Sequence, residues 1–306
     1  MKDSFVALDW GTTKLQAYWF AQDGQVLGTK KYSAGIGHIE RHQIEATVLD
    51  IKRRWQASIV YASGMIGSAL GWEVVPYQTS PASLADLSAS LVTSEISGMR
   101  CFLVPGLKCR SAYDSAEVMR GEELEVFGWL GMPECRGGEN LICLPGTHTK
   151  WVVTQDEHIQ HFHTALSSEL YDCLAKHSVL RGQLQHPSSP SNAFLNGVKD
   201  ATSKGQGLTR LLFGVRAKQL MNDMEESDAS SYCRGLLIGH ELADAMSSNQ
   251  PSNQDHSIPV IGNEFLAQLY ISALEYLGYA AHHVSAEKAL QQSYYALNLL
   301  RGERDD

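Results

Sequence analysis

The chain has 306 residues, of which 43% are hydrophobic and 19% are charged, and its formal net charge is −9. This length exceeds that of most single domains and the composition is that of a globular enzyme, so we expect two domains that share a cleft. The acidic balance and the scattered Lys and Arg residues argue against a nucleic-acid partner, which would need a basic face.

Membrane and secretory signals are missing from the sequence. Its apolar runs are short and interrupted by Gly, Pro or charged residues, so we expect no membrane span. Residues 1–4 lead straight into a strand-like segment without a signal-peptide pattern, so we expect a cytoplasmic protein. The six cysteines show neither a CxxC pair nor zinc-type spacing, which favours reduced thiols.

The first part of the chain reads as a strand, a tight turn and a hairpin. Residues 5–8 form an apolar strand that ends at Asp9, and a turn at 11–13 leads to a second apolar strand at 15–20. Asp23-Gly24 is a strong hairpin signal, and a third strand is expected at 25–30. Apolar residues at helical spacing predict a helix ending near Trp55. Further strands are expected at 58–62 and 100–104, and a helix at 114–130.

The same opening occurs a second time. A strand at 141–144, a turn at 145–149, a strand at 150–154, a hairpin at 155–157 and a strand at 159–164 repeat the first pattern. An internal duplication of this kind indicates two similar lobes, each a mixed sheet covered by helices. We place the N-terminal lobe at 1–115 and the C-terminal lobe at 116–306, with the last helix able to pack on the first lobe.

The rest of the second lobe is mostly helical. Helices are expected at 169–178, 193–201, 207–223, 228–247, 263–277 and 285–300, with a buried strand at 258–261 and a polar loop at 247–257.

The two turns have the chemistry of phosphate-binding loops. Backbone N–H groups that point the same way cradle phosphate oxygens, Gly allows a close approach, and Thr hydroxyls add donors. An Asp at the end of the preceding strand can hold hydrated Mg²⁺, because this ion usually keeps several waters. We therefore expect Asp9 to organise Mg²⁺ through water. The expected ATP phosphate ligands are Gly11, Thr12, Thr13, Gly146, Thr147, His148 and Thr149.

The two phosphate-type turns and a third motif resemble those of the actin-like ATPase superfamily, which includes sugar kinases, actin and the seventy-kilodalton chaperones. The turn after the strand at 258–261 looks like the adenosine motif of that superfamily, which assigns Gly262, Asn263 and Glu264 to adenosine binding. The resemblance implies a two-lobe α/β fold of the ribonuclease H-like type, with duplicated mixed sheets, flanking helices and a cleft between the lobes.

Within this superfamily, five segments are similar to the 2-dehydro-3-deoxygalactonokinase family. Membership would imply phosphorylation of the C6 hydroxyl of 2-dehydro-3-deoxy-D-galactonate by ATP with Mg²⁺, in galactonate breakdown. A homodimer is a reasonable further expectation from the resemblance. The segments that carry it are Ala7-Leu8-Asp9-Trp10-Gly11-Thr12-Thr13, Gly64-Met65-Ile66-Gly67-Ser68, Val118-Met119-Arg120-Gly121-Glu122-Glu123, Leu144-Pro145-Gly146-Thr147-His148-Thr149-Lys150-Trp151 and Gly235-Leu236-Leu237-Ile238-Gly239-His240-Glu241.

A kinase of this type needs a carboxylate to accept the proton of the attacking hydroxyl. Related carbohydrate kinases place it about twenty residues before the second phosphate loop, where this chain has Glu122 and Glu123. Glu122 is our candidate base and Glu123 the second candidate. Two solvated helix carboxylates would explain the same residues.

The substrate contacts are predicted from the segment at 63–67 and from two cations. Ser63, Gly64 and Met65 resemble the sugar-facing loop of these kinases, although a plain strand-to-helix connection has the same pattern. Arg120 could pair with the substrate carboxylate and Lys150 could neutralise charge. An exposed helix arginine and a surface lysine are the alternatives.

Two other functions fit the same loops. One is a kinase for a different sugar acid, such as 2-dehydro-3-deoxygluconate, because epimers are distinguished by only a few pocket groups. The other is a non-catalytic, actin-like nucleotide-binding protein. Such relatives usually carry an aspartate where this chain has Leu144, so phosphoryl transfer to a substrate hydroxyl is favoured.

Overall fold

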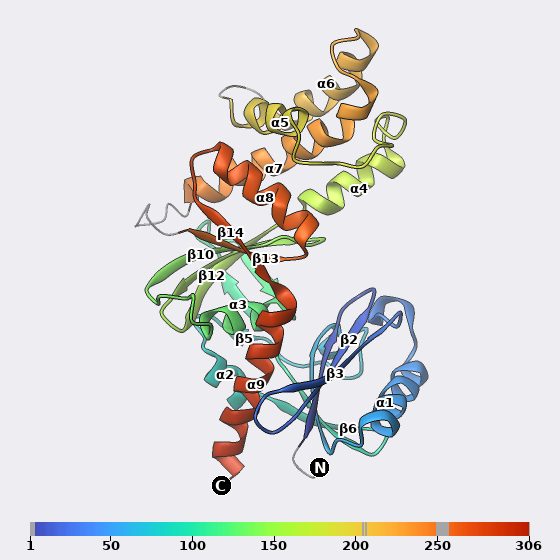
Figure 1. The fold of residues 1–306 in the computed structure, drawn as a ribbon, viewed down its shortest axis with the longest axis vertical. Helices are drawn as coiled ribbons and strands as arrows, with labels where there is room; N and C mark the ends of the chain where they lie inside the picture. Colours follow the sequence, from blue (N-terminus) through green and yellow to red (C-terminus); the bar gives the residue numbers. More distant parts are fainter. Residues whose placement is uncertain (1–3, 204, 206, 249–256, 306) are drawn as a thin grey trace.

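The computed structural model describes residues 4–203, 205, 207–248 and 257–305. Most of the polar loop predicted at 247–257 lies outside these residues. Figure 1 shows an elongated molecule with the N-terminal sheet at one end and a group of helices at the other.

The N-terminal sheet begins with the predicted three-stranded meander. β1 pairs with β2 in antiparallel register and with β4 in parallel register, and the strand order is β3-β2-β1-β4-β7-β6. Alternate residues of β1 face opposite sides of the sheet and belong to two different buried clusters. Both faces of this sheet are therefore covered. Its strands are β1 (Phe5–Trp10), β2 (Leu15–Phe20), β3 (Val26–Tyr32), β4 (Ile59–Gly64), β6 (Val92–Ile96) and β7 (Met99–Leu103).

The second sheet repeats this arrangement. β10 and β11 are antiparallel neighbours, β13 runs parallel to β10, and the order is β12-β11-β10-β13-β14. The duplication predicted from the two turns is therefore present in the topology. Its strands are β10 (Glu139–Leu144), β11 (Thr149–Gln155), β12 (His158–Ala165), β13 (Ile258–Gly262) and β14 (Ala281–Ser285).

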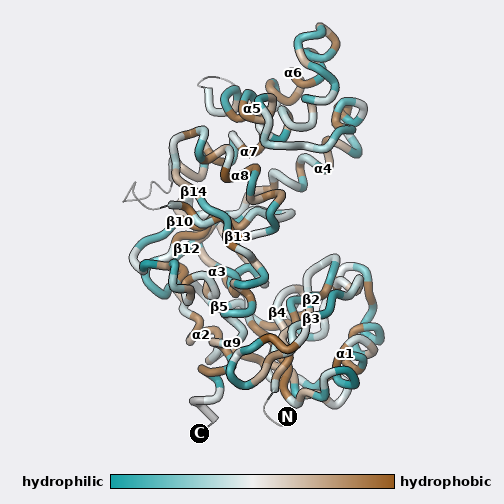
Figure 2. Tube along the Cα trace, viewed as in Figure 1, coloured by the Kyte–Doolittle hydropathy of each residue, from teal (hydrophilic) through white to brown (hydrophobic). Residues whose placement is uncertain are grey.

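Helices cover the faces of both sheets. The outer face of the first sheet packs on α1 (Arg41–Trp55), and the outer face of the second packs on α5 (Asn192–Thr202), α7 (Ala229–Ser248) and α8 (Glu264–Tyr276). The inner faces of both sheets share one core with α3 (Glu122–Leu130) and α9 (Ala286–Asp305). Figure 2 shows hydrophobic stretches along β4 and among the strands of the second sheet, as expected for these buried strands.

The last helix contacts the N-terminal sheet. In Figure 1, α9 (red) descends from the second sheet past α3 and α2 (Leu84–Ala89). Its Tyr294 hydroxyl donates a hydrogen bond of 3.0 Å to the carbonyl of Leu8 and lies 2.5 Å from the hydroxyl of Ser63. The division between the lobes near residue 115 stays a prediction, and that residue lies in the turn before β9.

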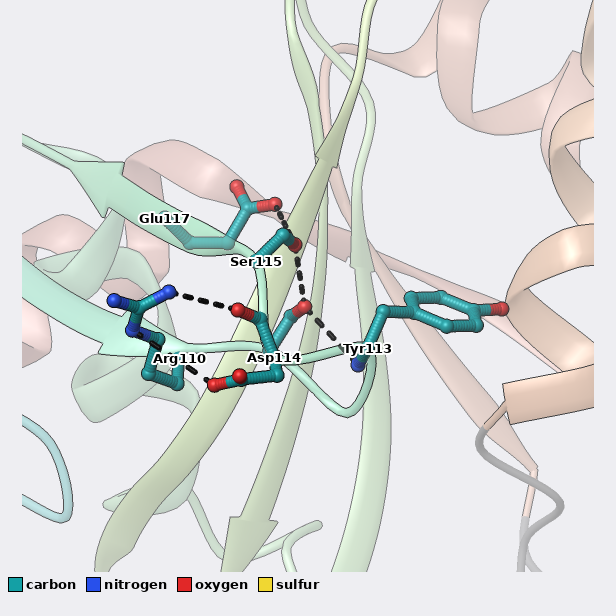
Figure 3. Close-up of polar contacts among 6 residues, drawn as sticks. Arg110, Tyr113, Asp114, Ser115 and Glu117 are labelled. Atoms are coloured by element: carbon teal, nitrogen blue, oxygen red, sulfur yellow. Dashed lines mark hydrogen bonds and ion pairs between the residues drawn. The ribbon is translucent and has the colours of Figure 1, made fainter.

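The helix predicted at 114–130 is wrong over residues 114–121, nearly half of its length. A small third sheet, ordered β5-β8-β9, occupies this region, and its strands are β5 (Gln78–Thr79), β8 (Leu107–Arg110) and β9 (Ala116–Met119). Figure 3 shows the β8–β9 turn, in which Arg110 donates a hydrogen bond of 2.8 Å to the carbonyl of Asp114 and Asp114 has a φ of 59°. Pairing with β8 thus holds this segment extended, and the helix begins only at Glu122.

A group of helices lies beyond the second sheet. α4 (Ser167–His177) and α6 (Leu208–Leu220) pack with α5 and α7 around their own apolar cluster. These helices agree with the predicted ones to within a few residues. Figure 1 shows the group at the end of the molecule opposite the N-terminal sheet.

Candidate active site

The first phosphate-type turn follows β1. The N–H of Gly11 donates to the carbonyl of Lys14 over 3.0 Å, which closes a tight turn at Thr12 and Thr13. Both threonines are exposed, and the carbonyl of Thr12 accepts a hydrogen bond of 2.9 Å from Gly37. The turn is therefore fixed by its backbone while its side chains remain available to a ligand.

Asp9, at the end of β1, lies in an electrostatic cluster of carboxylates. Its pKa is raised to about 6, chiefly by burial; the charge of Lys14 lowers it and the charge of Glu122 raises it. Burial also raises the pKa of Glu125 well above its ordinary value, with Asp9 and Glu122 as additional causes. The start of α3 therefore faces the first turn, and the predicted magnesium residue lies near the predicted base.

The two candidate bases differ in exposure. Glu122 is half-buried, and one of its oxygens accepts a hydrogen bond of 3.0 Å from the backbone N–H of Arg120. Glu123 is fully buried, and both of its oxygens accept from the N–H of Gly121 at 2.9 and 2.7 Å. Burial and the Glu122 charge raise the pKa of Glu123 to about 8, so it is largely protonated at neutral pH. Glu122 is the better placed of the two to accept a proton.

Two glycines let the sugar-facing loop approach the start of α3. Gly64 has a φ of 82° and Gly121 a φ of 113°, values that side-chain-bearing residues rarely adopt. A Cβ atom added to Gly121 would lie 3.4 Å from the Cα atom of Gly64. Gly64 is buried and Met65 half-buried at this contact. The segment at 63–67 thus forms one wall beside the carboxylates.

Arg120 is neither helical nor exposed. Its guanidinium lies 4.2 Å from the centre of the Tyr77 ring and donates a hydrogen bond of 2.8 Å to the carbonyl of Val75. Its Nε and Nη1 atoms are buried and have no hydrogen-bond partner within the described part of the chain. An unsatisfied buried donor is costly, so these two atoms retain the capacity to bind an acceptor, although neither is exposed on a cavity surface.

The second turn borders a cavity of about 500 Å³ on the C-terminal lobe. Gly146 and Thr147 line it at one end, next to the first turn of α4, where the N–H of Glu169 donates to the carbonyl of Thr147 over 3.3 Å. His148 is exposed and pairs with Glu169. A helix N-terminus beside a Gly-Thr turn is a favourable environment for phosphate.

The predicted adenosine motif lies at the same cavity. A Cβ atom added to Gly262 would lie 3.2 Å from the carbonyl oxygen of Pro145, so this position requires a very small residue. Asn263 lines the cavity and caps α8, accepting a hydrogen bond of 3.0 Å from the N–H of Leu266. Glu264 is exposed as the first residue of α8, and the cavity lining does not include it.

Three predicted ligand side chains are buried in internal contacts. Ser63 is 1% exposed and bonds to Tyr294, and Thr149 is 0% exposed with its hydroxyl 2.8 Å from that of Tyr270. Lys150 is 5% exposed, so it is no surface lysine, and its ammonium donates to the carbonyl of Val118. None of these side chains reaches the loop surface, so their direct ligand contacts lack geometric support.

The contact of Lys150 with β9 brings the two halves of the site together. Lys150 follows the second turn, and Val118 lies three residues before Gly121 at the start of α3. Because Asp9 also interacts electrostatically with Glu122 and Glu125, the region around the start of α3 contacts the segment after the second turn and lies near the end of β1.

Comparison with known proteins identifies the family. The profile of the 2-keto-3-deoxy-galactonokinase family matches residues 9–297. The chain belongs to this family. It is therefore a member of a family of carbohydrate kinases, as the five similar segments predicted.

Relatives of this kinase family match along their whole length. The 2-dehydro-3-deoxygalactonokinase of Escherichia coli (strain K12) is 29% identical over 95% of this chain and 96% of its own. A protein of Rhizobium meliloti (strain 1021) assigned the same activity is 30% identical over 94% of each chain. A crystal structure from Sinorhizobium meliloti, assigned likewise, is 28% identical, covers 96% of this chain and 97% of its own, and has a TM-score of 0.85. The predicted two-lobe, actin-like kinase fold is confirmed.

Among residues 4–203, 205, 207–248 and 257–305, no group of three or more His, Cys, Asp or Glu side chains could hold a metal ion. A lone Asp9 still suits Mg²⁺, which commonly binds one or two carboxylates and otherwise waters and phosphates. Within the same residues, every helix is too short or too polar to span a bilayer.

Sequence reasoning missed several residues of the site. Glu125 lies three positions after Glu122 on α3, a spacing that places both on one helix face and could have identified it. Arg234 and Phe265 line the cavity, but helical periodicity alone gives no reason to select them.

Proposed function

We propose that this chain transfers the terminal phosphoryl group of ATP to the C6 hydroxyl of 2-dehydro-3-deoxy-D-galactonate. The observation that carries the proposal is the cluster of Asp9, Glu122 and Arg120 beside the first turn, in a chain whose family is named for this reaction. The cavity at Gly146 and Thr147 supports nucleotide binding on the other side of the cluster.

Each residue has a separate role in this proposal. The exposed N–H and hydroxyl groups of Thr12, Thr13 and Thr147 bind phosphate oxygens. Glu122 accepts the proton of the substrate hydroxyl, whose oxygen forms the new bond to phosphorus while the bond to the leaving diphosphate breaks. Arg120 binds the substrate carboxylate and so fixes which hydroxyl reaches the phosphate.

Asp9 would hold Mg²⁺ through water. When bound, this ion neutralises charge on the phosphates. The ionised carboxylate is required for this, and the raised pKa of Asp9 makes its ionisation sensitive to pH near 6. Lys14 supports the ionised form because its charge lowers the pKa of Asp9.

The proposal also includes a cytoplasmic location, a small sugar acid as the substrate, no nucleic-acid or membrane partner, and a homodimer. The acidic net charge of −9 supports a metabolic enzyme without a nucleic-acid partner. The family resemblance supports the dimer.

A coupled assay tests the function. Purified protein is supplied with ATP, Mg²⁺ and either 2-dehydro-3-deoxygalactonate or its epimer 2-dehydro-3-deoxygluconate, and ADP release is followed. We expect a higher kcat/KM on the galactonate derivative. A higher kcat/KM on the epimer would make 2-dehydro-3-deoxygluconate the substrate. Nucleotide binding without turnover on any sugar acid would favour a non-catalytic protein.

A further inference from the structure

A buried carboxylate lies behind the second phosphate turn, in a segment that the proposed reaction does not use. Glu241 belongs to α7 and is 6% exposed. Its Oε1 atom accepts a hydrogen bond of 2.8 Å from the indole N–H of Trp151, and its Oε2 atom accepts one of 2.9 Å from the hydroxyl of Tyr270. Burial raises the pKa of Glu241, and hydrogen bonding from the side chains of Ser167, Trp151 and Tyr270 opposes this effect.

These donors come from three elements, of which α4 and α8 contribute lining residues to the cavity and β11 follows the turn that lines it. Trp151 is on β11, four residues after Thr147, and Ser167 is the first residue of α4. Tyr270 is on α8, the helix that begins directly after Asn263. Figure 1 shows α4, α7 and α8 together beyond the second sheet.

The network continues from Glu241 to the turn itself. The hydroxyl of Tyr270 lies 2.8 Å from that of Thr149, which is fully buried at the start of β11. On the opposite side, the residue after Ser167 lines the cavity together with Glu169, whose N–H contacts Thr147. One carboxylate thus connects both sides of the phosphate end of the cavity.

We propose that Glu241 is a positioning residue for nucleotide binding, which sets the second phosphate turn against the N-terminus of α4 through Trp151, Tyr270 and Ser167. The inference rests on the proposed function only in taking this cavity as the nucleotide site. It explains why a charged group is buried here, since such a group is retained only when donors compensate its desolvation. It also assigns Thr149 an indirect role in place of the predicted phosphate contact.

The test measures nucleotide binding directly. ADP is titrated into the full-length protein by calorimetry without sugar acid. Glu241→Gln keeps the shape of the side chain but removes its charge, and Tyr270→Phe removes one donor without changing charge. Because the charge-assisted hydrogen bonds from Trp151, Tyr270 and Ser167 to the carboxylate are weakened, we expect Glu241→Gln to raise the Kd for ADP roughly tenfold and Tyr270→Phe to raise it by a smaller factor.

A matched control separates positioning from general stability. Asp200 is also a helix carboxylate bound to a tyrosine hydroxyl: it accepts hydrogen bonds of 2.6 Å from Tyr232 and 3.1 Å from Lys218. It lines a different cavity. Asp200→Asn is expected to lower the melting temperature while changing the Kd for ADP by less than about twofold, as for a distant, independent site.

Several results would overturn the inference. They are ADP binding by Glu241→Gln as tight as that of the unaltered protein, an equal loss of binding in Asp200→Asn, and no ADP binding by the unaltered protein. If Glu241→Gln does not fold, the Kd for ADP of Tyr270→Phe is compared with that of Asp200→Asn. The inference then requires weaker binding by Tyr270→Phe. An unaltered protein that binds ADP but phosphorylates no sugar acid would refute the proposed function alone.

Discussion

Asp9 is held in surroundings that disfavour its charged form. Its pKa is raised from 3.8 to about 6, mainly by burial, with Lys14 lowering it and Glu122 raising it. The folded state therefore binds this proton more tightly than the unfolded state. As a result, ionisation of Asp9 lowers the free energy of unfolding as the pH rises from about 4 to 6, and the loss persists above pH 6. A costly carboxylate at the end of a strand is typical of a residue kept for function.

Asp9→Asn should therefore abolish turnover while making the protein more stable. At pH 7.5 we expect the free energy of unfolding to rise by about 2 kcal/mol, since the neutral amide avoids the cost of a buried charge. Urea unfolding at pH 7.5 and pH 4 checks this, and the difference should nearly vanish at pH 4. Unfolding of the variant at pH 7.5 would mark Asp9 as a structural residue.

Substitutions of the two adjacent glutamates should have different effects on kcat. Glu122→Gln should lower kcat by about 10²- to 10⁴-fold with unchanged ADP binding, because it removes the general base. Glu123→Gln should leave kcat nearly unchanged at pH 7, because Glu123 has a pKa of about 8 and is already largely neutral. Steady-state kinetics of both variants provide the measurement. The reverse pattern would make Glu123 the base.

A substitution of Arg120 should change the KM for the sugar acid and not the KM for ATP. Replacing its guanidinium in Arg120→Lys keeps the charge but loses the planar donors, so we expect the KM for the sugar acid to rise by roughly tenfold or more. The KM for ATP should stay the same. Arg110→Lys, in the exposed β8–β9 turn of Figure 3, is the control. A larger effect on the KM for ATP would contradict the assignment.

Helix α9 ties the end of the chain to the first strand. Tyr294 is 0% exposed and bonds to both the carbonyl of Leu8 and the hydroxyl of Ser63. Leu8 precedes Asp9 on β1, and Ser63 is the partner of Asp9 on the parallel strand β4. Nearer the end of the helix, Arg301 donates a hydrogen bond of 2.7 Å to the hydroxyl of Tyr61. α9 thus supports the edge of the sheet that presents Asp9.

Tyr294→Phe should destabilise the protein by about 1–3 kcal/mol, because it leaves a buried carbonyl and a buried hydroxyl without their partner. Tyr295→Phe, on the same helix with its ring against Gly24, is the control. Urea unfolding of both variants at neutral pH is the measurement. Equal stability of Tyr294→Phe and the unaltered protein would show that the contact contributes little.

Local patterns predicted most of the elements but not their long-range contacts. The two meanders and their turns follow from alternating apolar residues and Asp-Gly or Gly-Thr sequences. The third sheet was missed because its short strands are stabilised only by pairing between distant segments, such as β5 with β8. The burial of Ser63 and Thr149 depends on tyrosines that lie 231 and 121 residues away along the chain. Such partners cannot be read from local spacing.

The complete molecule has one core that spans both sheets. The inner faces of the two sheets, α3 and α9 share it, so the two phosphate turns are carried by a connected framework. α3 begins at the proposed catalytic carboxylate and lies within this core, so we expect a movement of either sheet to change the geometry of the site. Kinases of this kind close on substrate to keep water from the phosphate, and we expect the same here.

A crystal structure with a non-hydrolysable ATP analogue and the sugar acid tests the central claim most directly. The account predicts phosphates that contact both Gly11–Thr13 and Gly146–Thr147, with the substrate hydroxyl near Glu122 and its carboxylate at Arg120. A nucleotide bound at only one of these turns, with the other directed away from it, would contradict the account.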